Sequence, residues 1–137
     1  MVGVPELKDL LCDEFQDAVR ESLVRHTSIL DILSKYQEAS ARISRAISKA
    51  VTTCGCIQIE ASKPDLPSDI TLQELRNYMT THLKGNLCEH CVEVVEEEIG
   101  RQLFYLAALC NALDLNIYDV LIKEHKKLST LGIFNIS

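Results

Sequence analysis

The chain has 137 residues, 47% of them hydrophobic, which is enough for one core and too short for two ordinary domains. Its 14 basic residues stand against 20 acidic ones, and the net charge of −6 argues against affinity for nucleic-acid phosphates. No apolar leader precedes Glu6-Leu7-Lys8-Asp9, and no apolar run approaches the length of a membrane span. We therefore expect one cytoplasmic domain over residues 1–137, with neither a membrane nor a nucleic acid as partner.

Two helices are predicted before the first cysteine pair. The first begins near Pro5, a residue suited to the first helical position, and Thr27 or Ser28 can cap a second that runs without Gly or Pro to Val51. Their expected buried faces, spaced three and four residues apart, are Leu7, Leu11, Phe15, Ala18 and Ser22, then Leu30, Leu33, Gln37, Ser40, Ile43, Ile47 and Ala50. The two polar members of the second face mean either a polar cavity beside this helix or a rotation of its apolar stripe.

A loop excursion is predicted over residues 57–70. Ile57-Gln58-Ile59 alternates like a short extended piece, and Pro64 and Pro67 block helix formation. Thr71 and Glu74 then form a capping box. The third helix that it opens is expected to pass through Leu75, Tyr78, Met79 and Leu83 and to end at Gly85.

Two more helices follow the second cysteine pair. The fourth is expected from Glu89 to Leu113, and Asn116 can cap a fifth that ends before Gly132. The expected buried face of the fourth helix comprises Val92, Val95, Ile99, Leu103, Leu106, Cys110 and Leu113, and the fifth helix carries Ile117, Val120, Leu121, Glu124 and Leu128 at helical spacing. Strands have almost no support, so the predicted fold class is all-α, a bundle of about five helices.

Four of the six cysteines form two close pairs, Cys54-Gly55-Cys56 and Cys88-Glu89-His90-Cys91. Two short chelating turns brought together by the fold are the usual source of a tetrahedral four-thiolate site, and zinc is its expected occupant. Because four thiolates leave no position for water, such a zinc ion is structural and staples the second helix to the fourth. An iron–sulfur cluster and a disulfide pair stay open as alternatives.

A resemblance emerges in the fourth and fifth helices. The segment EEEIGRQLFYLAALCNALDLNIYDVLIKEHKKL, Glu96 to Leu128, is similar to the second half of MazG-type nucleoside triphosphate pyrophosphohydrolases. In that family an acidic helix leads through a short turn into a final helix ending in lysines. The resemblance covers about 33 residues well and the second helix weakly, and it implies a MazG-like helical bundle.

The same resemblance implies a magnesium site, and here the chain departs from the family. The family motif E-E-x-x-E reads Gln37-Glu38-Ala39-Ser40-Ala41, and E-x-x-D reads Glu98-Ile99-Gly100-Arg101. Only Glu38 and Glu98 remain of five carboxylates, and Arg101 brings a positive charge where a ligand is expected. Glu38, Glu98 and Arg101 either form an ion-pair network in place of the metal, or Arg42 and Arg101 contact an anion such as a nucleotide phosphate.

These observations predict a non-catalytic, zinc-stapled helical domain that acts through self-assembly or by binding a partner or a nucleotide. The family's pairing of domains implies a homo-oligomer, either a dimer or a dimer of dimers. The alternative is a magnesium-dependent nucleoside triphosphate pyrophosphohydrolase, with Glu38 and Glu98 as its candidate catalytic residues. A third hypothesis is a thiol or metal sensor that acts through the cysteine pairs.

Overall fold

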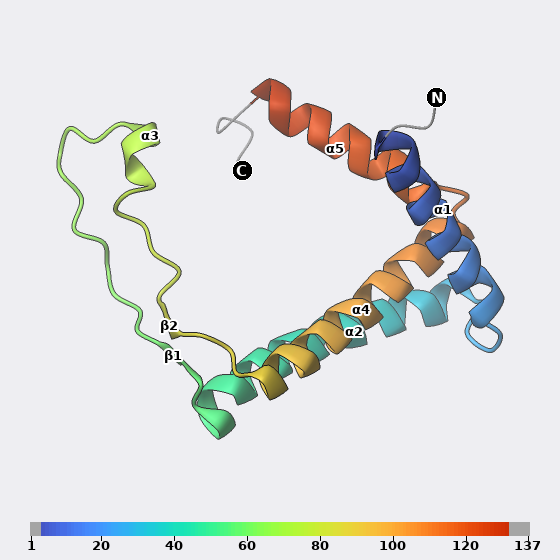
Figure 1. The fold of residues 1–137 in the computed structure, drawn as a ribbon, viewed down its shortest axis with the longest axis horizontal. Helices are drawn as coiled ribbons and strands as arrows, with labels where there is room; N and C mark the ends of the chain where they lie inside the picture. The colour runs from blue at the N-terminus through green and yellow to red at the C-terminus, as the bar shows by residue number, and fades with distance from the viewer. Residues whose placement is uncertain (1–3, 132–137) are drawn as a thin grey trace. The chain divides into compact units, whose positions relative to one another are not determined.

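The computed structural model describes residues 4–131, and these are mostly helical, which confirms the all-α class (Figure 1). In chain order the elements are α1 (Val4–Ser22), α2 (Ile29–Lys49), the π-helical turn η1 (Ala50–Cys54), β1 (Ile57–Ile59), α3 (Leu72–Leu75), β2 (Leu83–Gly85), α4 (Glu89–Ala112) and α5 (Ile117–Leu131). The two strands form a small antiparallel sheet that the sequence did not predict as such.

The chain divides into two compact units. The helical unit comprises residues 1–41 and 99–137, and the cysteine unit comprises residues 42–98. Both α2 and α4 contribute residues to each unit. The expectation of one domain over residues 1–137 stays a prediction.

The helical unit has a small core. Val19 of α1, Ile32 of α2, and Ala107 and Ala108 of α4 are each no more than 2% exposed. Leu23, Phe104, Leu109 and Ile117 pack against them. Two of the four buried residues are alanines, whose small side chains allow α2 and α4 to approach closely. Few large apolar side chains are buried in this core as a result.

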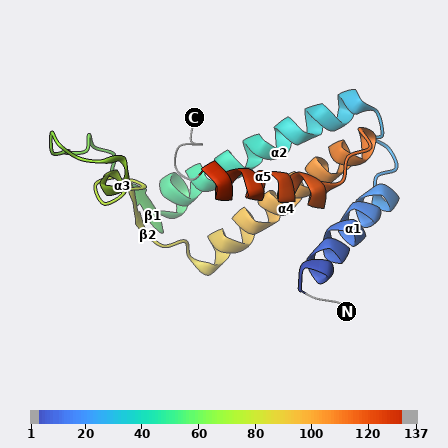
Figure 2. The same cartoon turned by 90° about the horizontal axis from the view of Figure 1, so that it is seen from above.

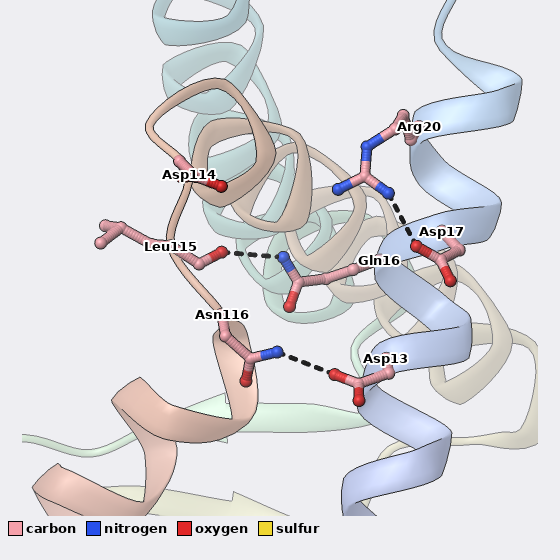
Figure 3. Close-up of a pocket in the computed structure, with 7 residues that line it drawn as sticks. All are labelled: Asp13, Gln16, Asp17, Arg20, Asp114, Leu115 and Asn116. Carbon is pink, nitrogen blue, oxygen red and sulfur yellow. Dashed lines mark hydrogen bonds and ion pairs between the residues drawn. The ribbon is translucent and has the colours of Figure 1, made fainter.

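A buried glutamine attaches α1 to the turn between α4 and α5. Gln16 is 5% exposed, and its Nε2 donates to Asn111 Oδ1 at 2.9 Å and to the Leu115 carbonyl at 3.0 Å. Its Oε1 accepts the backbone N–H of Ile117 at 2.7 Å. Figure 3 shows Gln16 reaching from α1 toward this turn. These hydrogen bonds fix the position of α1 against the turn between α4 and α5. A displacement of α1 would leave several buried polar groups without hydrogen-bond partners.

The predicted helix caps are present. Ser28 Oγ accepts the N–H of Leu30 at 3.3 Å, and Asn116 Oδ1 accepts the N–H of Asp119 at 3.0 Å. Thr71 and Glu74 form the full capping box. Each cap satisfies backbone donors that have no partner inside their helix.

The third helix is much shorter than predicted. It ends at Leu75, and the expectation that it continues through Tyr78, Met79 and Leu83 to Gly85 is wrong. Tyr78 and Met79 are 44% and 53% exposed, so a longer helix would have no apolar surface to pack on. Instead Leu83–Gly85 forms β2, which pairs with β1 in the register Ile59↔Leu83 and Ile57↔Gly85.

The second helix also ends differently. The α-helical hydrogen bonding of α2 stops at Lys49 rather than Val51, and the chain continues as the wider turn η1. The N–H of Gly55 closes that turn on the Ala50 carbonyl at 2.8 Å. Within the helical unit, Ser40 Oγ accepts a hydrogen bond from Gln102 Nε2 at 2.8 Å, so this polar interruption of the stripe is a contact between α2 and α4.

Much of the predicted buried surface is exposed in the single chain. Ile32 and Ala39 are the residues of α2 that are buried, whereas Leu30 and Leu33 of the expected face are 71% and 42% exposed. Further residues predicted as buried and found exposed are Leu11, Phe15, Ile47, Ile99, Leu103, Leu113, Val120, Leu121 and Leu128. These predictions are wrong for the single chain, in which the buried apolar residues of the helical unit include Val19, Ile32, Ala39, Ala107 and Ala108 instead.

Candidate functional site

The structure brings the two cysteine pairs together in the cysteine unit. The Sγ atoms of Cys54, Cys56, Cys88 and Cys91 all lie within 4.8 Å of one another. The Cys54 and Cys88 sulfurs are 3.8 Å apart. Cys54 is exposed, Cys56 and Cys88 are half-buried, and Cys91 is buried. Four soft donors at this spacing can hold one metal ion.

Three local features position the four thiols. Cys54 ends η1, and Gly55, whose φ of 83° lies in the left-handed region, reverses the chain before Cys56. Cys88 and Cys91 stand at the N-terminus of α4, three residues apart. Ala50, Ile57 and Cys91 form a buried cluster beneath the sulfurs. In Figures 1 and 2 the end of α2, the hairpin strands and the start of α4 meet here.

Gly85 is a part of this site that sequence reasoning missed. It has a φ of 86°, and a Cβ atom at this position would lie 2.6 Å from the carbonyl oxygen of Cys56. The sequence pattern predicts Gly85 at the end of a helix, whereas it lies in β2 and lets this strand approach the first cysteine pair. Its place three residues before Cys88 is the signal that could have revealed it.

Hydrogen bonding divides the protons unevenly among the thiols. The backbone N–H of Cys91, followed by the Cys91 side chain, lowers the pKa of Cys88 to about 7. The hydrogen bond to Cys88 is the main reason that the pKa of Cys91 rises to about 12, and burial adds to the rise. Cys88 therefore carries most of the thiolate character at neutral pH, and Cys91 keeps its proton until a cation displaces it.

A shallow basic pocket of about 150 Å³ lies beside α2 in the same unit. It is lined by Arg42, Arg45, Ala46, Lys49, Val94 and Glu98. The Glu98 side chain is 14% exposed, and its Oε1 lies 4.0 Å from a guanidinium nitrogen of Arg42. Three cations and one carboxylate give this pocket the opposite sign to the chain as a whole.

The remaining candidate residues lie in the helical unit. Glu38 pairs with Lys35 at 3.3 Å on the exposed side of α2. Arg101 is partly buried on α4. Arg42, which the sequence predicts as an anion contact, lies beside the Glu98 carboxylate in the cysteine unit. The role of Arg45 and Lys49 in the pocket follows from their spacing of three and seven residues after Arg42.

The helical unit has a second, larger pocket of about 380 Å³ that no motif predicted (Figure 3). It is lined by Asp13, Gln16, Asp17, Arg20, Asp114, Leu115 and Asn116. Asp17 pairs with Arg20 at 2.7 Å, and Asp13 accepts from Asn116 at 2.8 Å. The first pair lies within α1, and the second bond joins α1 to the α4–α5 turn.

In comparisons with known proteins, no family model, curated protein or solved structure matches the chain. Among the described helices, none is by itself both long and apolar enough to cross a membrane. Only the bent pair Glu89–Ala112 and Ile117–Thr130 meets that length and composition test when taken together.

Proposed function

We propose that the chain binds one structural zinc ion through Cys54, Cys56, Cys88 and Cys91 and works as a non-catalytic helical domain. The proposal rests on one observation, the meeting of the four sulfurs within 4.8 Å. Zinc–sulfur bonds of about 2.3 Å in a tetrahedron place the sulfurs about 3.8 Å apart. The 3.8 Å between Cys54 and Cys88 already equals that edge, so small side-chain rotations complete the site.

Zinc accounts for this arrangement better than the alternatives. A multi-iron cluster would separate its cysteines further, because several metal ions and sulfides stand between them. A closed four-thiolate site offers no coordination position to a substrate, which gives the zinc a structural role. It ties η1 to the start of α4 and thereby anchors the loop between β1 and β2.

Elemental analysis of protein purified without added metal tests this proposal. About one zinc per chain is expected, and Cys91→Ser should lose the metal and lower the free energy of unfolding by about 4 kcal/mol. Cys12→Ser is the matched control, since Cys12 lies in α1 outside the cluster and should leave the zinc content unchanged. Metal-free protein, or an unchanged unfolding transition in Cys91→Ser, would rule out a structural zinc.

Self-assembly is the proposed mode of action, and the exposed apolar faces support it. Leu30 and Leu33 of α2 and Leu103 of α4 match the spacing of a buried stripe, yet each is at least 42% exposed. A second copy of the chain would remove such faces from water, and burial contributes about 25 cal/mol per Å². The homodimer or dimer of dimers and the MazG-like ancestry belong to this same proposal.

The basic pocket supports nucleotide binding without magnesium. A phosphate group needs cationic donors, and Arg42, Arg45 and Lys49 of this pocket supply them. Calorimetry with nucleoside triphosphates should therefore detect binding that Arg45→Gln weakens. Arg25→Gln changes an exposed arginine outside the pocket and serves as the control.

The alternative function is a metal-dependent nucleoside triphosphate pyrophosphohydrolase that uses Glu38 and Glu98. The guanidinium of Arg42 beside Glu98 opposes it, because a fixed positive charge repels a divalent cation. Pyrophosphate release from a panel of triphosphates with magnesium would favour this alternative only if Glu98→Ala abolishes it.

A further inference from the structure

The four thiols differ in their access to solvent, and this asymmetry has a chemical consequence. Cys54 is exposed at the end of η1, whereas Cys91 is 7% exposed and packs with Ala50 and Ile57. A small oxidant therefore meets the Cys54 sulfur first. Thiolates bound to zinc keep their nucleophilic character, so exposure decides which of them reacts.

Cys88 is the cysteine best placed to resolve an oxidised Cys54. Their sulfurs are 3.8 Å apart, and Cys88 is half-buried just before the first turn of α4. Cys56 also lies within the group of four, but its Sγ donates toward the Ala50 carbonyl oxygen at 3.9 Å. Cys54 and Cys88 thus combine an exposed sulfur with a second sulfur at 3.8 Å.

We propose that peroxide converts the zinc staple into a disulfide between Cys54 and Cys88, with release of the metal. This inference rests on the proposed zinc site. Both links join the same two points of the chain, the end of η1 and the start of α4, so the loop between β1 and β2 stays anchored when the zinc leaves. The site is then a reversible redox switch whose reduced form holds zinc and whose oxidised form holds a covalent bond.

The reaction balances with peroxide as the oxidant. The Cys54 sulfur attacks one peroxide oxygen, the O–O bond breaks, and a sulfenic acid and a hydroxide ion form. The Cys88 thiolate then attacks the Cys54 sulfur, the S–S bond forms, and a second hydroxide leaves. Two electrons pass from the two sulfurs to the peroxide oxygens. The zinc ion, left with two ligands, dissociates, and Cys56 and Cys91 take protons from water.

The test uses the full zinc-loaded chain and hydrogen peroxide. Zinc release is followed with a chromogenic chelator, and the oxidised protein is alkylated and digested with trypsin and a glutamyl endopeptidase. Cleavage after Glu89 separates Cys88 from Cys91, and fragmentation by mass spectrometry distinguishes Cys54 from Cys56. The expected result is loss of zinc together with a peptide pair linked through Cys54 and Cys88, reversed by a thiol reductant and zinc.

Each outcome supports or overturns the inference. Dominant links within Cys54-Gly55-Cys56 or between Cys88 and Cys91, or zinc that resists peroxide, would overturn it. Cys54→Ser should lose the linked peptide pair, whereas Cys12→Ser should keep it. Protein that contains no zinc before oxidation refutes the proposed function instead, so the two failures are distinguishable.

Discussion

Cys88 and Cys91 are three residues apart at the same helix end, yet their thiols hold protons very differently. The N–H of Cys91 lowers the pKa of Cys88 to about 7, and the hydrogen bond to Cys88 raises the pKa of Cys91 to about 12. A zinc ion must displace the proton of Cys91 throughout the neutral range, but that of Cys88 only below about pH 7. The number of protons that zinc must displace from the four thiols therefore changes with pH.

Zinc affinity should accordingly fall as the pH is lowered, and more steeply below about pH 7. A depressed pKa keeps Cys88 a thiolate above about 7, and this advantage is lost as the pH falls through that value. Each additional displaced proton weakens apparent affinity about tenfold per pH unit. Competition with a chelator of known protonation behaviour measures this slope, and a slope unchanged across pH 7 would contradict the assignment to Cys88.

Gly85→Ala should weaken the metal site more than Gly55→Ala. Both glycines have a left-handed φ, which costs another residue about 1–2 kcal/mol. At Gly85 the new Cβ would also meet the Cys56 carbonyl at 2.6 Å, whereas at Gly55 it meets nothing within 4 Å. Zinc retention against a chelator and the unfolding transition measure the difference. Equal losses in the two variants would mean that the close approach of β2 to Cys56 is unimportant.

At the scale of elements, the predictions of helix caps agree with the structure better than the predictions of which residues are buried. The caps at Ser28, Thr71 and Asn116 are as predicted, because a cap depends on a few neighbouring residues. The extent of α3 and the strand β2 were not predicted, since both depend on what a segment can pack or pair with. Leu83 and Gly85 carry no helical or strand signal strong enough to decide between the two.

The attachment of α1 gives a test at this scale. Gln16→Leu should leave the Ile117 N–H and the Leu115 carbonyl without their Gln16 partner, at a cost of roughly 2–4 kcal/mol in the free energy of unfolding, whereas Asn111 keeps its bonds to Arg20 and to the backbone carbonyl of residue 16. Hydrogen exchange at the Ile117 amide should accelerate as well. Gln73→Leu, at an exposed position of α3, is the control and should change stability by less than about 0.5 kcal/mol. Unchanged protection of Ile117 would argue against this hydrogen bond.

At the scale of the whole molecule, the main question is what covers the apolar faces of the helices. The fully buried hydrophobic residues of the helical unit include Val19, Ile32 and several alanines, which is a small core for helices of this length. Side chains predicted as core, such as Leu33 and Leu103, remain 42% and 46% exposed. Helices with apolar faces of this kind usually bury them against another chain.

We therefore expect a homodimer or a dimer of dimers in solution, which light scattering measures directly. Leu33→Glu combined with Leu103→Glu should shift the mass toward the monomer, because each introduced charge would have to leave water in the interface. Val24→Glu is the control, since Val24 is 77% exposed in the segment between α1 and α2 and lies outside the predicted stripes. A strictly monomeric wild-type protein would contradict self-assembly as the mode of action.

The helical class, the main helix starts and the grouping of four cysteines into two chelating turns follow from the amino-acid sequence, because periodicity, caps and short spacings are local properties. The convergence of the four sulfurs, the place of Gly85 beside Cys56 and the contact of Glu98 with Arg42 are established by the folded chain. The folded chain also shows which helix faces are buried in the single chain. Those features depend on the placement of segments that are far apart in the sequence. The free energy that stabilises them comes from packing and strand pairing between segments, which no single segment encodes.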